Sequence, residues 1–242
     1  MDIQQTIIDD IYADLEDYLH SNPKINITID KTNDDDYYTE GLHCSGIGSC
    51  KRKEVMSYFN FDKKPHNLQT MLTFMRGNFY HELIYQWLEQ SSLFLINEKE
   101  LDVSNLLPEP FRGKFDVCFI HRPTNKFILA DIKTANSNQF KVYSKTLPKD
   151  NHKMQLSAYA SVFKAWDYLL MMYFSSGSDK PRLFVIDYMK DINDIMNKYI
   201  EAVNKYKDTK ELPPVLDKMF AEKEVWQCSY CNYKDISCEG YK

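Results

Sequence analysis

The side chains most able to take part in catalysis or binding lie in two short runs of sequence that end at Asp116 and at Lys133. Between them lies Arg-Pro-Thr-Asn, residues 122–125, which is typical of a turn, so the runs are predicted to be two strands of a β-hairpin. In a hairpin that is symmetric about the centre of this turn, Asp116 lies opposite Asp131 on the same face of the sheet. Because side chains alternate along a strand, Lys133 shares that face.

Two carboxylates beside a lysine on a half-buried sheet face suggest a binding site for a divalent ion. Hard carboxylate oxygens suit Mg²⁺ or Mn²⁺, and the lysine can assist an attacking water or offset negative charge on a phosphate. The alternative is a set of ordinary cross-strand ion pairs on the surface. A register slip of one residue would send Asp116 to the other face, so the metal-site hypothesis depends on the register.

Hydrophobic periodicity predicts the elements that position these residues. The order is helix, three strands, helix, two strands and helix, which indicates an α/β or α+β domain built around one mixed sheet. A further short strand is expected after the first helix. The predicted helices are 3–19, 71–88, 154–166 and 193–206, and the predicted strands are 25–29, 93–103, 111–120, 126–133, 168–174 and 182–188.

Length and composition limit the class of protein. The chain has 242 residues, 43% of them hydrophobic and 27% charged, as in ordinary globular domains. The longest apolar run, residues 168–174, is far below the roughly 20 residues that span a bilayer, and the N-terminus does not resemble a signal peptide. We therefore expect a soluble, intracellular protein without a membrane partner. The net charge of −5 argues against a protein that coats nucleic acid, but not against an enzyme with a local basic groove.

Three cysteines near the C-terminus have the spacing of a metal site. Cys228 and Cys231 are separated by two residues, and Cys238 follows. A site of four thiolates needs one more ligand, which either Cys44 or Cys50 can supply. Structural zinc is one candidate occupant of such a site. The remaining cysteine, at position 118, lies in an apolar strand and is expected to be a small buried residue.

The helices on either side of the hairpin add further candidate site residues. His81 lies on the predicted helix 71–88, and Gln155 and Tyr159 are four residues apart on the helix after the hairpin, so they share one face. A helical histidine, a Gly113-to-Asp116 strand, an Asp131-to-Lys133 strand and a Gln-Tyr helix follow one another in this order. Each motif is weak alone, but the ordered set resembles the RecB-type branch of the PD-(D/E)XK nucleases.

The resemblance implies a fold and a role for each residue. The fold is a restriction-endonuclease-like α/β core, a mixed central sheet flanked by helices. His81, Asp116, Asp131 and the Ile132 carbonyl would hold a catalytic Mg²⁺ or Mn²⁺. Lys133 would serve the attacking water and the scissile phosphate. The remaining implied residues, which would position DNA or the lysine, are Gln155 and Tyr159, and one of Glu98 and Glu100 is a further candidate on the preceding strand.

The cysteines extend the resemblance toward cluster-bearing members of this branch, such as CRISPR-associated RecB-like exonucleases and the AddB nuclease domain. In those enzymes one upstream cysteine and three C-terminal cysteines hold a [4Fe–4S] cluster that joins the two ends of the fold. Ser45 precedes Cys50, which basic residues follow, as in the family pattern, although Lys51 replaces the usual proline. The resemblance therefore implies a cluster on Cys50, Cys228, Cys231 and Cys238, with zinc as the alternative occupant and Cys44 as the alternative ligand.

Taken together, the sequence suggests residues 1–40 as a helical appendage and 41–242 as a RecB-like nuclease domain that includes cluster-binding segments 44–53 and 226–240. The resemblance implies an exonuclease on DNA ends, with single strands favoured, that hydrolyses phosphodiesters with a metal-activated water. Alternatives are a CRISPR-type end-processing nuclease that works with an integrase, a catalytically silent DNA- or partner-binding module, and a zinc-bound interaction protein. The cellular setting is expected to be the cytoplasm, or a host cell for a phage or viral protein, with recombination or integration proteins as possible partners.

Overall fold

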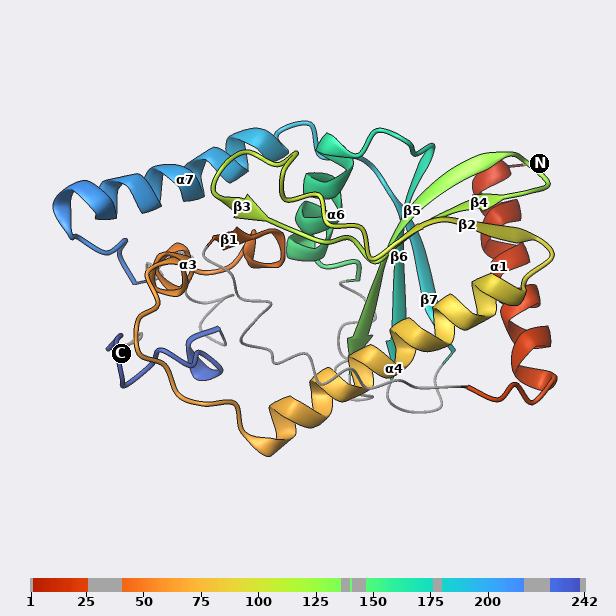
Figure 1. The fold of residues 1–242 in the computed structure, drawn as a ribbon, viewed down its shortest axis with the longest axis horizontal. Coiled ribbons are helices and arrows are strands. Elements are labelled where there is room, and N and C mark those ends of the chain that lie inside the picture. Colours follow the sequence, from red (N-terminus) through yellow and green to blue (C-terminus); the bar gives the residue numbers. More distant parts are fainter. Residues whose placement is uncertain are drawn as a thin grey trace.

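The computed structural model describes residues 2–25, 41–135, 140, 147–175, 180–215 and 227–239. In this part of the chain, helices lie on both faces of one mixed sheet (Figure 1). The helices are α1 (Ile3–His20), η1 (Cys44–Gly46), α3 (Lys51–Tyr58), α4 (Leu68–Gln90), α6 (Asp150–Val162) and α7 (Ile192–Thr209). The strands are β1 (Leu42–His43), β2 (Phe94–Lys99), β3 (Phe111–Arg112), β4 (Val117–His121), β5 (Lys126–Ala135), β6 (Tyr168–Ser175) and β7 (Arg182–Ile186).

The main sheet has five strands in the order β2-β4-β5-β6-β7. Only β5 and β6 run parallel, and the other neighbours are antiparallel. Val117 pairs with Ala130 and Phe119 with Ile128, so the predicted register of the hairpin is confirmed. The prediction of one unbroken strand over 111–120 is wrong, because β3 pairs with β1 in a separate two-stranded sheet and β4 begins only at Val117.

Both faces of the sheet are buried, because β4, β5 and β6 are apolar on both sides. Cys118, Leu129 and Met171 contribute to a core shared with α6 and α7. Their neighbours on the opposite face contribute to a second core shared with α1 and α4, among them Phe119 and Ala130. The expectation of a half-buried sheet face at the hairpin is therefore wrong, and the hairpin acids lie at the edge of a core that α6 covers.

Helix α4 changes character along its length. It begins at an N-cap, Asn67, whose side chain accepts a hydrogen bond from the Thr70 amide at 2.9 Å. Residues 71–75 are exposed, whereas Leu83, Ile84 and Trp87 are buried against the sheet and α1. The first half of α4 therefore projects beyond the sheet, toward α3 and the C-terminal segment (Figure 1).

The other elements agree closely with the pattern of the sequence. The predicted helix 71–88 is α4, and the predicted strand 168–174 is β6. The structure adds the short helix α3, which the charged sequence of residues 51–58 did not indicate. The predicted strand 25–29 lies, apart from Ile25, outside the described residues. None of the described helices has both the length and the apolar character needed to cross a bilayer.

Candidate active site

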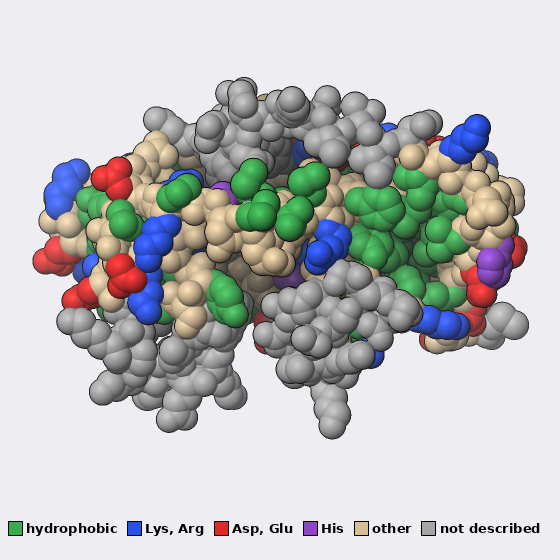
Figure 2. Space-filling model, turned by 90° about the horizontal axis from the view of Figure 1, so that it is seen from below, with side chains coloured by type: hydrophobic (Ala, Val, Ile, Leu, Met, Phe, Trp, Pro, Cys, Tyr) green, Lys and Arg blue, Asp and Glu red, His purple; other side chains and the backbone are tan. Residues whose placement is uncertain are grey.

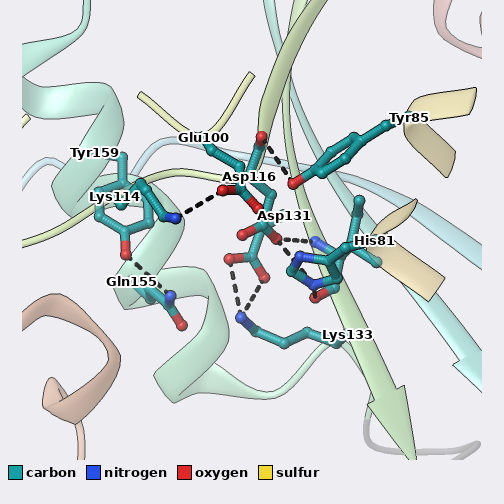
Figure 3. A network of polar contacts seen from close by, with 10 residues as sticks. His81, Tyr85, Glu100, Lys114, Asp116, Asp131, Lys133, Gln155 and Tyr159 are labelled. Carbon is teal, nitrogen blue, oxygen red and sulfur yellow. Dashed lines mark hydrogen bonds and ion pairs between the residues drawn. The ribbon is translucent and has the colours of Figure 1, made fainter. Parts of the chain in front are cut away.

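The site forms where β5 extends past Val117, the first residue of β4. Beyond Ala130, β5 has no ladder partner on the β4 side, so the backbone groups of Ile132 need other partners. The Ile132 amide donates to Asp116 Oδ2 at 2.6 Å. The Ile132 carbonyl oxygen lies 3.3 Å from His81 Nε2, and this nitrogen is 3.8 Å from Asp116 Oδ2. The carboxylate of Asp116, directly before β4, and an imidazole from α4 thus take the place of the missing strand (Figure 3).

Asp131 and Lys133 form a compact ion pair on the α6 side of β5. The Lys133 ammonium donates to Asp131 Oδ1 at 2.9 Å and lies 2.8 Å from Oδ2. The Asp131 side chain is 1% exposed and that of Lys133 is 21% exposed. Strand alternation explains the pairing, since residues two apart in β5 point to the same face. The lysine can therefore reach solvent, while the carboxylate cannot.

Burial and charge act in opposite directions at this pair. Burial raises the pKa of Asp131 to about 6, with a contribution from the nearby Asp116 carboxylate, although Lys133 opposes it. Burial alone would lower the pKa of Lys133, but the carboxylates of Asp131 and Asp116 outweigh it and raise that pKa. Lys133 is therefore a firmly charged ammonium, beside a carboxyl group that titrates close to neutrality.

Gln155 and Tyr159 face the hairpin from α6. The Gln155 amide donates to the Tyr159 hydroxyl at 3.1 Å, and burial holds the pKa of Tyr159 far above its usual value. The two side chains line a cavity of about 310 Å³ together with Arg112 and Lys114. Both polar side chains lie beside the hairpin carboxylates without contacting them directly (Figure 3). All the residues predicted for the site are thus gathered in one region.

Two neighbours of Asp116 were missed or left open by the sequence, Tyr85 and Glu100. Glu100, one of two alternatives on the preceding strand, accepts an ion pair from Lys114 at 2.7 Å, and its amide donates to the Asp116 carbonyl at 2.8 Å. The Tyr85 hydroxyl donates to the same carbonyl at 3.2 Å. Glu98 instead lies in β2, opposite Cys118. The helical spacing of Tyr85 and His81, four residues apart, was the available signal for Tyr85.

A second group of polar side chains, Tyr173 and His152, lies beside Lys133. Tyr173, opposite Lys133 in the β5–β6 register, binds His152 Nδ1 through its hydroxyl at 2.8 Å and also accepts from the Lys149 amide at 3.2 Å. Burial, with the charges of Lys133 and Lys149, lowers the pKa of His152 to about 2. His152 is therefore neutral, and the rings of His152 and Tyr173 stack beside the lysine. His152 is three residues before Gln155, a spacing that could have identified it.

The donor set suits a hard divalent cation. It comprises two carboxylates, an imidazole and a backbone carbonyl, and the buried Asp131 Oδ2 lies 2.8 Å from its ion-pair partner, the Lys133 ammonium. In the described part of the chain, however, no group of three or more His, Cys, Asp or Glu side chains already converges on one metal position. A cation would have to draw Asp131 away from Lys133 and His81 away from Ile132.

The cysteines form a second assembly, near the chain ends. Cys50, Cys228, Cys231 and Cys238 line one small cavity of about 20 Å³. None of the six cysteines, all of which lie among the described residues, forms a disulfide. Cys44 lies elsewhere, in the core beside Gly113 and Tyr159, a location that favours Cys50 as the upstream member of the set.

Backbone and side-chain hydrogen bonds hold the two chain ends together around these thiols. The Cys50 amide donates to the Gln227 side chain at 3.1 Å, and the Lys64 amide donates to the Asn232 carbonyl at 2.9 Å. Within the C-terminal segment, the Cys231 amide donates to the Cys228 carbonyl at 3.3 Å. A tight turn between these two cysteines therefore presents both sulfurs to the same cavity.

No protein-family model and no curated protein matches the sequence. Among solved structures, similarity to the crystal structure of SSO0001 covers 98% of this chain and 99% of that chain, at 18% identity and a TM-score of 0.55. Similarity to LHK-Exo in complex with dAMP covers 72% of this chain and 91% of that chain, at 9% identity and a TM-score of 0.52. LHK-Exo is an alkaline exonuclease from Laribacter hongkongensis. At these identities the likeness concerns the fold, so the chain has a mixed α/β fold that it shares with an exonuclease.

Proposed function

We propose that the protein is a metal-dependent nuclease that hydrolyses DNA. The observation that carries this proposal is the gathering of Asp116, Asp131, Lys133 and His81 at the open edge of β5. The shared fold with an exonuclease adds support. A catalytically silent module of this fold would be expected to have lost at least one of these groups.

The cation proposed for this site is Mg²⁺ or Mn²⁺, held by Asp116, Asp131, His81 and the Ile132 carbonyl. Such an ion would supply a water of lowered pKa and positive charge near the scissile phosphate. The carboxylate and carbonyl oxygens suit Mg²⁺ and Mn²⁺ alike, and the neutral imidazole is also a good ligand for Mn²⁺. The ion would also offset the negative charges of Asp116 and Asp131 at the core edge.

Lys133 has a separate role in this proposal. When a cation takes Asp131, the ammonium is free to turn outward through its exposed end, toward a phosphate. There it offsets the negative charge that grows as water attacks phosphorus. Tyr173 and His152 pack beside it and restrict where the lysine can go.

Gln155, Tyr159 and Lys114 would contact the nucleotide chain from the cavity of about 310 Å³ beside the hairpin. An amide and a phenol donate hydrogen bonds to phosphate or sugar oxygens, and such contacts set position rather than sequence preference. The action we propose is exonucleolytic, on ends of single-stranded DNA. End processing alongside an integrase uses the same chemistry and is the second candidate.

For the cysteines we propose a [4Fe–4S] cluster on Cys50, Cys228, Cys231 and Cys238, with zinc as the alternative. Four thiols that line one cavity suit either occupant. Lys53 and Lys234 also line this cavity and would offset the charge of the thiolates. Iron and zinc analysis of anaerobically purified protein separates the two: iron with broad absorbance near ~400 nm supports the cluster, and stoichiometric zinc without iron contradicts it.

The test of the nuclease proposal compares wild type with Lys133→Ala on end-labelled single- and double-stranded DNA at saturating Mn²⁺. Loss of a preorganised charge of this kind typically slows a reaction by about 10²–10³, so the variant should cleave at least ~100-fold more slowly. Its thermal midpoint and its Mn²⁺ affinity should be retained. No metal-dependent cleavage by the wild type, or near-normal cleavage by the variant, would overturn the assignment.

A further inference from the structure

A cavity of about 720 Å³ lies away from the hairpin. It is bounded by α3, by the first turns of α4 and by the C-terminal segment that carries the three cysteines. These elements are far apart in sequence but adjacent on one side of the molecule (Figure 1). The candidate nuclease residues are not part of its lining, so this cavity has a role still to be assigned.

The lining of this cavity is basic and polar. Lys53, Lys63, Lys64 and Lys234 contribute ammonium groups, against the carboxylates of Glu54 and Asp235. Glu54 is buried and pairs with Lys53, and Asp235 pairs with Lys64 at 3.3 Å. The lysines therefore exceed the acids in a chain whose net charge is −5. A local excess of positive charge in an acidic protein suits a polyanion.

Exposed aromatic side chains lie among these lysines. Phe74 and Tyr230, which are 41% and 81% exposed, both line the cavity, and His66 contacts the Phe74 ring edge to face. Figure 2, which looks onto the α4 side, shows hydrophobic side chains gathered near the middle of this face with lysine or arginine side chains close by. Exposed rings beside ammonium groups are the combination that binds unpaired bases and their phosphates.

The cavity is connected to the candidate active site in two ways. His43 and Ser45 line both this cavity and the one beside Gln155 and Tyr159. In addition, residues 70 and 74 line the cavity and share one face of α4 with His81. Phe74 and His81 are two helical turns apart, roughly 10 Å, or about three nucleotide steps of a stacked strand.

Gly77 lies between Phe74 and His81 on this face of α4. Glycine is the poorest helix former after proline, and among the described residues outside α4 an added Cβ would come within 4 Å of Thr134 Oγ1 alone, at 3.9 Å. Gly77 lies next to Thr134, which directly follows Lys133 in β5. Because glycine has no side chain, no side chain projects from α4 at this position between the cavity and the active site. A chain that runs between the two would pass over this position.

We infer that this cavity is a distal binding site for single-stranded nucleic acid, which holds the strand a few nucleotides from the bond that is cut. The inference rests on the proposed nuclease function and extends it by naming the groove that the substrate follows. Phosphates lie against the lysines, and bases stack on Phe74 and Tyr230.

Binding of fluorescein-labelled oligo-dT of twelve nucleotides, without divalent metal, tests the groove directly. In Lys63→Gln/Lys64→Gln the slope of log K against log salt should fall by about 1.4, since each phosphate contact of a single strand contributes roughly 0.7. Phe74→Ala should weaken binding about tenfold through the loss of one stacked base. The matched control Lys198→Gln/Lys205→Gln, on α7, should leave the slope and the affinity unchanged.

Gly77→Leu provides a variant that should fold at least as well as wild type. Its thermal midpoint should be equal or higher, yet it should bind the twelve-nucleotide strand about tenfold less tightly and bind a trinucleotide as wild type does. Gln69→Leu, on α4 but off this face, is its control. An unchanged salt slope in the lysine variant, normal binding by Gly77→Leu, or equal affinity for duplex and single strand would each overturn the inference. Absence of cleavage by the wild type would overturn the nuclease proposal instead. The binding data would still show whether the cavity binds single-stranded nucleic acid.

Discussion

The hairpin site and the cysteine site bring reactive side chains together in opposite ways. At the hairpin, Asp116 directly precedes β4, and Asp131 directly follows the last residue of β5 that pairs with β4, so the end of the β4–β5 ladder sets their separation. At the cysteine site, Cys50 must meet three residues near the end of the chain, across a few long-range hydrogen bonds such as that from the Lys64 amide to Asn232. The first site is part of a sheet with a core on both faces, whereas the second joins the start of α3, beside the core residues Ile47 and Val55, to the C-terminal segment.

This difference predicts which property each site controls. A side chain at the hairpin can be removed without breaking the ladder, so its loss should reduce activity and leave stability largely intact. Among residues 227–239 of the C-terminal segment only Cys228 and Tyr233 are buried, so a bound group there would contribute much of the stability of that region. Activity and stability should therefore separate between the two sites.

The largest effect is expected for Asp131→Asn, which keeps the shape of the side chain but removes its charge. Because metal assistance contributes several kcal/mol to such hydrolysis, cleavage should fall by about 10³-fold or more. Isothermal titration should show loss of Mn²⁺ binding, and the thermal midpoint should change little. A variant that still binds Mn²⁺ with wild-type affinity would exclude Asp131 as a ligand.

The converse result is expected for Cys231→Ser. Loss of one ligand should release the bound group and cost roughly 3 kcal/mol or more, which lowers the midpoint by about 6–12 °C in a chain of this size. Because Cys231 also lines the basic cavity, binding of single strands should weaken as well. Cys44→Ser, which alters a thiol outside the cysteine cavity, is the control for metal content. A wild-type midpoint in Cys231→Ser would remove the structural role of the site.

His81→Ala is a further test, at the hairpin site, of the difference between the two sites. Its imidazole is 27% exposed and contacts Asp116 and Ile132, so its loss should cost little stability. The Mn²⁺ concentration for half-maximal cleavage should rise by at least the roughly 10- to 100-fold that loss of even an indirect metal partner costs. If the variant unfolds while its metal requirement stays unchanged, His81 is a core residue and not a ligand.

The smallest effect is a pH dependence. Burial raises the pKa of Asp131 to about 6, so the carboxylate needed for activity is lost below that pH, and kcat/KM should fall tenfold per pH unit there. Protonation of Asp131 below that pH should not destabilise the fold. A carboxyl group with a raised pKa adds most to stability when protonated, and this contribution is lost as pH rises through about 6. A pH profile that is flat from 5 to 8, with the midpoint recorded at each pH, would contradict this account of Asp131.

The sequence determined the parts of this protein that depend on local pattern. Helical and strand periodicity indicated α1, α4, α6 and the central strands, and a four-residue turn set the register that pairs Val117 with Ala130. That register brings Asp116 and Asp131 to the same end of the ladder, and strand alternation places Asp131 and Lys133 on one face. Because β4 and β5 are consecutive in the sequence, their pairing could be predicted without any tertiary information.

Tertiary structure alone decided the contacts between distant segments. His81 reaches the hairpin only because β4 begins at Val117 and leaves the Ile132 carbonyl without a partner from that strand. Cys50, and not Cys44, lines the cysteine cavity because the short helix α3 turns it toward the C-terminal segment. The basic cavity also depends on α3, α4 and the chain end together. Such contacts arise from how whole elements pack, which no local periodicity encodes.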